Sequence, residues 1–221
     1  RTAGGDQPGE LDMSDSLPLD IVPLDICIDV ASWQDDPDTP QDDIDWESVY
    51  ASGIRIAFVK AMESPHHAYS TWKPQSEGAR RAGLVVIPYL YLRRTTNPRL
   101  VVSTFAERVE MKPGMAFALD WEGRTNQPAS AEDAEQIGEQ LALIAGRKPI
   151  GYWGIPGSTP SMPTEVMVTW PRWVPRYPTR GAKNFAHVRQ EARENPAKYW
   201  FPDGVLNSRI PVFAQYTAWG R

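Results

Sequence analysis

Short apolar runs alternate along the chain with longer, amphipathic polar stretches. Each of the seven apolar runs holds five to nine residues and is typical of a buried strand. Strands that alternate with helices of about 10–15 residues form βαβ units and a parallel sheet. The predicted strands lie within residues 25–30, 54–60, 84–92, 115–121, 149–153, 169–174 and 210–217, and the predicted helices within 46–52, 73–82, 98–111 and 130–145.

The ends of three predicted helices carry capping residues. Asp45 precedes the first helix and can accept hydrogen bonds as its N-cap. The spacing of Ser130 and Asp133 resembles a capping box at the start of the fourth helix. Gly83 follows the second helix and is typical of a helix stop. These local signals agree with the boundaries that the apolar pattern predicts.

The number of strands favours a barrel. Seven or eight strands in about 195 residues are too many for a small open sheet, although a complete eightfold β/α barrel typically needs about 250 residues. The second half of the chain is rich in proline, and its helical signals are weaker. We therefore predict a single barrel domain over residues 25–221, with regular βα units first and simpler strands afterwards. Residues 1–24 are rich in Gly, Pro and Asp and predict an acidic linker or N-terminal arm.

The charge of the chain is unevenly distributed. Its first 45 residues contain thirteen acidic residues and one arginine, whereas the remainder carries a net charge of +7, for a total of −5. A mildly basic body is compatible with an anionic polymer as partner. However, no run of five Lys or Arg residues marks a nucleic-acid site, so we expect no nucleic-acid partner. Ordinary solvated surface charge is the alternative that the pattern leaves open.

The composition excludes several classes of protein. No run approaches the roughly 18–20 apolar residues of a membrane span, and no apolar segment of a signal peptide follows the N-terminus. Cys27 is the single cysteine, and the three histidines are too few for a familiar metal centre. We therefore predict no metal, and we expect His66 and His67 in a surface loop. The chain also has no Gly-rich phosphate loop and no Gly-x-Ser-x-Gly nucleophile motif.

Acidic and aromatic residues gather where the predicted strands end. In a parallel barrel the active site lies at the carboxyl ends of the strands. Aromatic faces can stack on sugar rings and carboxyl groups can transfer protons, so this combination suits a carbohydrate. The strand-end residues are Asp29, Lys60, Glu63, Tyr89, Tyr91, Arg93, Asp120, Glu122, Tyr152, Trp153, Trp173, Gln215, Tyr216 and Trp219.

Asp120 and Glu122 are the sharpest candidates for catalysis. At positions i and i+2 of a strand their side chains point to the same side, with Cα atoms roughly 6.6 Å apart. Two carboxyl groups so close do not ionise independently, and one tends to keep a proton. Glycosidases use one carboxyl group as acid and a second as nucleophile, base or stabiliser. Asp29 from the first strand is a third candidate. The alternative is that the Asp-x-Glu sequence lies in a solvent-exposed loop or caps the next helix.

With these residues in view, the chain resembles the glycoside hydrolase family 25 muramidases, the lysozymes of bacteriophage endolysins and bacterial autolysins. The resemblance covers about residues 25–219, in order and with plausible spacing. Two departures are Tyr91, where the family usually has Phe, and Trp121, which is bulkier than the usual residue between the two acids. The matching motifs are Asp29–Gln34, Asp45-Trp46, Ala57–Glu63, Ile87–Tyr91, Leu119–Glu122, Trp173–Tyr177 and Gln215-Tyr216.

The resemblance implies a flattened, TIM-like (β/α)5β3 barrel that cleaves the β-1,4 bond between N-acetylmuramic acid and N-acetylglucosamine in peptidoglycan without a cofactor. Glu122 would be the proton donor. Asp120 and Asp29 would position the substrate's acetamido group or stabilise the charged transition state. A direct carboxylate nucleophile and assistance by the acetamido group both remain open. The implied substrate-binding residues are Glu63, Tyr89, Tyr91, Tyr152, Trp173, Gln215 and Tyr216.

The same resemblance implies where the protein acts and in which form. We expect an enzyme that acts on the bacterial cell wall as a monomer, either made in a host cytoplasm and released or secreted. The acidic arm and the start at Arg1 without Met favour the central module of a multidomain phage lysin, tethered to other lysin domains.

Three alternatives to a muramidase remain. The first is a non-catalytic cell-wall carbohydrate-binding module on the same barrel, although binding alone does not require a cluster of mutually repelling acids. The second is a peptidoglycan amidase or peptidase, for which the His and Cys inventory is poor. The third is a purely structural protein.

Overall fold

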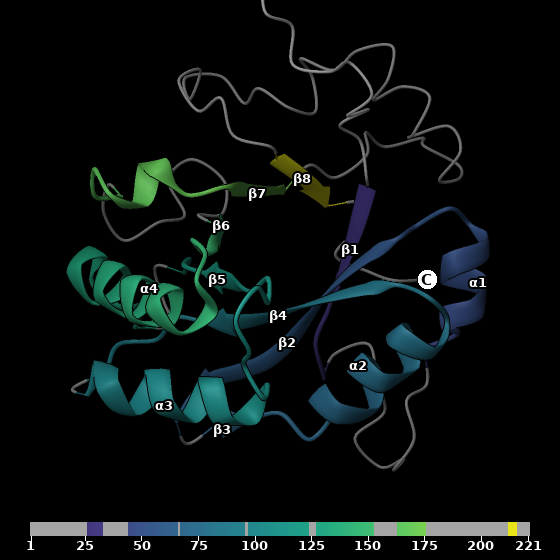
Figure 1. The fold of residues 1–221 in the computed structure, drawn as a ribbon, viewed down its shortest axis with the longest axis horizontal. Coiled ribbons are helices and arrows are strands. Elements are labelled where there is room, and N and C mark those ends of the chain that lie inside the picture. The colour runs from purple at the N-terminus through teal and green to yellow at the C-terminus, as the bar shows by residue number, and fades with distance from the viewer. Residues whose placement is uncertain are drawn as a thin grey trace, which may run out of the picture.

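The computed structural model describes residues 26–32, 44–65, 67–95, 97–123, 127–152, 163–175 and 212–215 (Figure 1). Each of the seven predicted apolar runs overlaps a strand, and each of the four predicted helical stretches overlaps a helix. The elements are β1 (Ile26–Val30), α1 (Trp46–Ala51), β2 (Ile56–Ser64), β3 (His67–Ala68), α2 (Trp72–Arg81), β4 (Val85–Tyr91), α3 (Pro98–Arg108), β5 (Ala118–Asp120), α4 (Ala131–Ala145), β6 (Ile150–Tyr152), the 3₁₀ turn Met167–Thr169, β7 (Arg172–Pro175) and β8 (Val212–Gln215).

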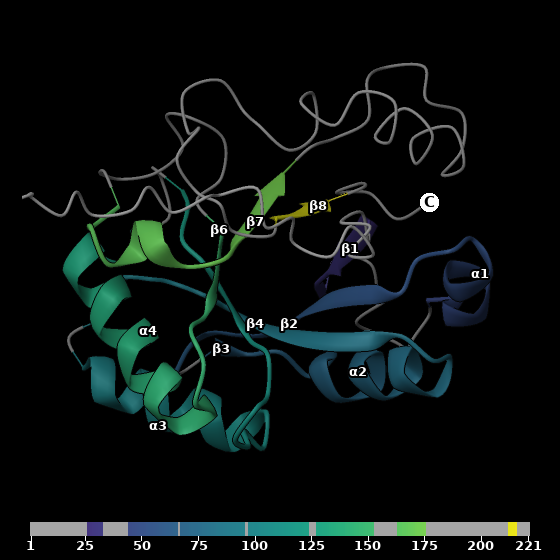
Figure 2. The same cartoon turned by 45° about the horizontal axis from the view of Figure 1, so that its top comes forward.

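The strands form one curled sheet in the order β1-β8-β7-β6-β5-β4-β2-β3. All pairs are parallel except β2 with β3, and β1 pairs with β2 as well as with β8. Figure 2 shows α2 and α3 on one side of β2 and β4, with β1, β7 and β8 on the other. The fold is therefore mixed α/β with a curled parallel sheet, as predicted. Residues 153–162, between β6 and β7, and residues 176–211, between β7 and β8, lie outside the described residues. The full (β/α)5β3 count therefore stays a prediction.

Alternate strand residues belong to two separate apolar layers. In β2, Phe58 belongs to an inner layer, whereas Ala57 and Val59 belong to an outer layer shared with the helices. In β5, Ala118 belongs to the inner layer and Leu119 to the outer one. Successive strand residues point to opposite faces, so strands buried on both faces read as nearly continuous apolar runs. The inner layer comprises Cys27, Ile56, Phe58, Ile87, Tyr89, Ala118, Ile150, Tyr152 and Trp173.

The three predicted capping positions are confirmed. The Asp45 carboxylate accepts a hydrogen bond from the Ser48 amide at 2.9 Å, and the Ser130 hydroxyl accepts one from the Asp133 amide at 3.0 Å. Each such cap stabilises its helix by about 1 kcal/mol. Gly83 follows α2 with a φ of +92°, a conformation that glycine adopts without strain.

The short strand β3 was not predicted. His67 lies in β3, where it pairs antiparallel to Ser64 of β2, and not in an irregular loop. Its side chain is exposed, in agreement with a surface position, and His66 lies outside the described residues. A two-residue strand has no periodicity that a sequence pattern can reveal. Among the described helices, none combines the length and the apolar character that crossing a membrane requires.

Candidate active site

Strand register gathers the candidate residues at one edge of the sheet. Lys60 of β2 pairs with Tyr89 of β4, and Tyr91 of β4 pairs with Asp120 of β5. Asp120 in turn pairs with Tyr152 of β6. Paired residues of neighbouring strands share a face of the sheet. These side chains therefore lie on the inner face, near the carboxyl ends of their strands, which is where parallel barrels carry their active sites.

Asp29 joins this group from the other end of the chain. It lies in β1 and pairs with Phe58, whose side chain belongs to the inner layer. Burial is the main cause of the raised pKa values of Tyr89 and Asp120, and the negative charge of Asp29 raises both values further. The structure thus brings the acid of the first strand into electrostatic contact with the acid of β5, as the sequence predicted.

Asp120 and Glu122 form a coupled pair of carboxyl groups. Asp120 is 7% exposed, and burial raises its pKa well above the ordinary value. The charge of Glu122 raises the pKa of Asp120 further, and Lys60 opposes this effect. Burial also raises the pKa of Glu122, which is half-buried, and Lys60 again opposes the shift. The pair therefore retains a proton at higher pH than exposed carboxyl groups do.

The backbone beyond β5 is fixed by neighbouring elements. The sequence places both acids on one strand, but β5 ends at Asp120. Pairing continues one residue further, because the Trp121 amide donates to the Tyr152 carbonyl at 2.8 Å. The fully buried Trp121 indole also donates to the Ala129 carbonyl at 2.8 Å, and the Tyr91 hydroxyl donates to the Glu122 carbonyl at 3.2 Å. These contacts hold Glu122 next to Asp120.

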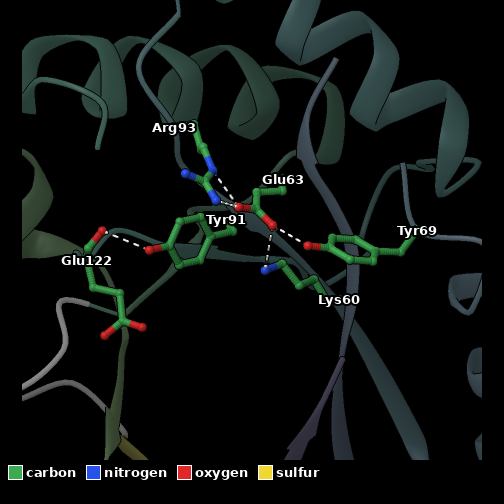
Figure 3. Close-up of polar contacts among 6 residues, drawn as sticks. All are labelled: Lys60, Glu63, Tyr69, Tyr91, Arg93 and Glu122. Carbon is green, nitrogen blue, oxygen red and sulfur yellow. Dashed lines mark hydrogen bonds and ion pairs between the residues drawn. The ribbon is translucent and has the colours of Figure 1, made fainter. Parts of the chain in front are cut away.

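Glu63 lies at the centre of a network of charged and polar side chains (Figure 3). Its carboxylate accepts hydrogen bonds from Lys60 at 3.1 Å and from the Tyr69 hydroxyl, and it forms an ion pair with Arg93. Burial acts to raise the pKa of Glu63, but Tyr69, Lys60 and Arg93 together lower it to about 2. Glu63 is therefore ionised at neutral pH.

Lys60 connects this network to the carboxyl pair. Its ammonium nitrogen lies 4.4 Å from the centre of the Tyr91 ring and 5.0 Å from that of Tyr69. Tyr91 contacts Lys60 through its ring face and Glu122 through its hydroxyl. The sequence singled out Lys60 and Arg93 only as strand-end residues. Tyr69 was missed because it follows β3, outside every apolar run, and carries no signal of its position.

The predicted aromatic residues pack against one another inside the sheet. The Trp173 ring stacks on Phe58 with centres 4.2 Å apart, and it contacts Tyr152 at 4.8 Å and Tyr89 edge-on at 5.4 Å. Trp173 is only 1% exposed. These rings fill the interior beside the acids, so they support the shape of the site.

Other candidates are only partly described. Gln215 lies in β8, where its backbone pairs with Cys27 and Pro175. Over the described ranges, no group of three or more His, Cys, Asp or Glu side chains is arranged to hold a metal ion. The predicted candidates Trp153, Tyr216 and Trp219 lie outside the described residues.

Interacting carboxyl groups at the strand ends of a curled parallel sheet suit glycoside hydrolysis, in which one group donates a proton and another assists. Residues 28–200 match the family model of Glycosyl hydrolases family 25, and the chain belongs to this family. The resemblance inferred from the sequence motifs is thus confirmed. A comparison with curated proteins gives no match.

Several solved structures share the fold. The bacterial lysozyme from Streptomyces coelicolor is 20% identical, with a TM-score of 0.60 over 88% of this chain and 84% of that chain. The muramidase from Acremonium alcalophilum is 23% identical, with a TM-score of 0.54 over 69% of this chain and 77% of that chain. The family 25 glycosyl hydrolase from Bacillus anthracis is 20% identical, with a TM-score of 0.54 over 67% and 69% of the two chains.

Proposed function

We propose that this family 25 glycoside hydrolase is a peptidoglycan hydrolase that cleaves the β-1,4 bond between N-acetylmuramic acid and N-acetylglucosamine. The observation that carries the proposal is the coupled pair of Asp120 and Glu122 at the carboxyl end of β5. The names lysozyme and muramidase, which similar solved structures carry, support the substrate class.

Glu122 is the proposed proton donor. A general acid must keep its proton near neutral pH and must reach the leaving oxygen. Burial raises the pKa of Glu122, and its half-buried side chain retains contact with solvent. Asp120 is more deeply buried, so it is less suited to deliver a proton to a bulky glycan.

Asp120 and Asp29 are the proposed assisting residues. The buried Oδ1 atom of Asp120 has no hydrogen-bond partner among the described residues, so it is suited to accept the N–H of a substrate acetamido group. With the proton of the pair on Glu122, Asp120 is the carboxylate, and both assistance by the acetamido group and direct attack by Asp120 are compatible with this arrangement. Asp29 would then stabilise the positive charge of the transition state.

The remaining predicted residues would bind or support the glycan. We assign direct substrate contacts to Gln215 and Tyr216. Tyr89, Tyr91, Tyr152 and Trp173 would act mainly by filling the interior beneath the sugar, since all four are buried. Glu63, whose carboxylate is engaged by protein groups, would act on the substrate indirectly.

The wider assignments are also proposals. We propose that residues 25–221 form one (β/α)5β3 domain, that residues 1–24 form an acidic arm, and that the protein acts on cell walls as a monomeric module of a phage lysin. The alternative is a carbohydrate-binding module on the same barrel. Burying repelling acids is costly and serves catalysis more than binding, which favours the enzyme.

The bond that is cut can be identified directly. Purified peptidoglycan is digested with the full chain, and the products are reduced with borohydride and analysed by mass spectrometry. New ends that carry reduced N-acetylmuramic acid would support the proposal. Reduced N-acetylglucosamine ends, or free peptides without new reducing ends, would contradict it. Co-sedimentation with the wall without any cleavage would identify a binding module.

A further inference from the structure

Lys60 carries a positive charge in the interior of the protein. Its side chain is 9% exposed, and it comes from β2, whose residues also contribute to the inner apolar layer. A buried ammonium group needs compensation by opposite charge or by aromatic faces. Lys60 has both, since Glu63 lies at 3.1 Å and the Tyr91 ring centre at 4.4 Å. The position of its charge is therefore determined by these neighbours.

Glu63 is held independently of Lys60. Arg93 approaches one carboxylate oxygen of Glu63, while Tyr69 donates to the other, which also accepts from Lys60. Arg93 and Tyr69 come from segments outside β2, so they fix the carboxylate from two further directions (Figure 3). Glu63 is thus a fixed acceptor that positions the Lys60 ammonium group.

The charges of this network do not cancel. One carboxylate, Glu63, faces two cations, Lys60 and Arg93, so the three groups carry a net charge of +1. The Arg93 side chain is 37% exposed and is screened by water, whereas that of Lys60 is 9% exposed. The surplus positive charge therefore acts mainly from Lys60 into the interior. There Tyr91, whose ring centre lies 4.4 Å from the Lys60 nitrogen, pairs with Asp120 and donates its hydroxyl hydrogen bond to the Glu122 carbonyl.

We propose that Glu63 is a positioning residue that fixes the Lys60 ammonium group over Tyr91, and that Lys60 in this place sets how many protons the Asp120–Glu122 pair holds. This inference rests on the proposed function only for its effect on catalysis. The titratable and charged groups of the network and of the carboxyl pair are Asp29 from β1, Glu63 from β2, Tyr69 after β3, Tyr89 and Tyr91 from β4, Arg93 after β4, and Asp120 and Glu122 at the end of β5.

Two substitutions should shift the pKa values of the Asp120–Glu122 pair in opposite directions. Lys60 opposes the raised pKa values of Asp120 and Glu122, so Lys60→Met should raise both by about one unit. Glu63 instead raises the pKa of Asp120, and its loss also frees Lys60 to approach the pair. Glu63→Gln should therefore lower the apparent pKa values. Lys60→Arg, which retains the charge, should stay close to the parent.

The test is a carboxyl ¹³C NMR titration of the folded chain and these three variants, with thermal melts to verify folding. Lys73 and Glu77 form a matched ion pair on the outer helix α2, at 4.0 Å and with Lys73 80% exposed. Lys73→Met and Glu77→Gln are therefore controls that should leave the pKa values of Asp120 and Glu122 unchanged. Opposite shifts for Lys60→Met and Glu63→Gln would support the proposal. Unchanged pKa values, or shifts of the same sign, would overturn it.

The pH dependence of glycan cleavage gives a second readout. Both limbs of the profile should move to higher pH in Lys60→Met and to lower pH in Glu63→Gln. A merely structural role would lower activity without moving the limbs. If the folded parent cleaves no glycan, the proposed function fails, but the titration still decides whether Glu63 and Lys60 control the pair.

Discussion

The hydroxyl group of Tyr91 donates a hydrogen bond to the backbone oxygen of Glu122 at 3.2 Å. Strand β4 thereby supports a residue that lies beyond the end of β5. The same tyrosine presents its ring face to the Lys60 ammonium group. Tyr91 therefore links the charged network around Glu63 to the carboxyl group that we propose as proton donor.

Tyr91→Phe removes this hydrogen bond and keeps the aromatic ring. We expect the free energy of unfolding to fall by about 0.5–1.5 kcal/mol, the usual net value of one hydrogen bond. We also expect kcat to fall more than KM changes, because Glu122 loses part of its support. Urea unfolding and steady-state kinetics on soluble glycan fragments measure both. Unchanged kcat with reduced stability would show that the bond is only structural.

Asp120→Asn should stabilise the protein at neutral pH. The pKa of Asp120 is raised by burial and by Glu122, so its ionisation destabilises the folded state. A group with a raised carboxyl pKa costs stability as pH rises above its unfolded value near 3.9. The Tm of the variant should therefore exceed that of the parent by a few degrees at pH 7, and the difference should shrink towards pH 4.

Thermal melts of both proteins between pH 4 and pH 7 measure this difference. Activity should fall in the same variant, since sites that strain the fold commonly serve catalysis. A Tm difference that does not depend on pH would show that Asp120 titrates normally.

Trp121→Phe should destabilise the protein strongly. The indole N–H of Trp121 donates to the Ala129 carbonyl at 2.8 Å, and the side chain is fully buried. The smaller ring leaves this carbonyl without its donor and opens a small cavity, at a total cost of about 2–4 kcal/mol. Denaturant unfolding measures the change. A loss below about 0.5 kcal/mol would show that the contact contributes little.

Gly138→Ala tests the packing of α4 on Trp170. A Cβ atom at position 138 would lie 2.3 Å from the Trp170 ring and 3.1 Å from Leu119. Relieving this overlap should cost about 1–3 kcal/mol, more than the gain of up to about 1 kcal/mol in helix propensity. Glu139→Ala, at an exposed position of the same helix, is the control. A Gly138→Ala variant at least as stable as the parent would contradict the described packing.

The sequence predicts much of the fold because its signals are local. Strands buried on both faces produce apolar runs, and Asp45 and Ser130 mark helix starts through short-range caps. Strand β3 escaped prediction because its pairing depends on β2 and not on its own residues. The closing pairs of the sheet, such as β1 with β8, join segments at opposite ends of the chain and depend on the whole fold.

The candidate site is less predictable than the fold. The residue types at strand ends identify Asp29, Asp120 and Glu122 as acids on a common edge. Sequence spacing does not reveal that Tyr69 and Arg93 bind the Glu63 carboxylate, because these partners meet it only in three dimensions. Its assignment to direct substrate binding stays a prediction, and its described contacts favour an indirect role.

The central claim is that Glu122 is the proton donor of a muramidase. The most direct test compares the release of reducing ends from purified peptidoglycan by the parent chain and by Glu122→Gln, with Glu139→Gln on the surface of α4 as matched control and thermal melts to verify folding. We predict a loss of more than about a hundredfold for Glu122→Gln, the size expected for general-acid catalysis, and parent-like activity for the control. Equal activity of parent and Glu122→Gln would contradict the account.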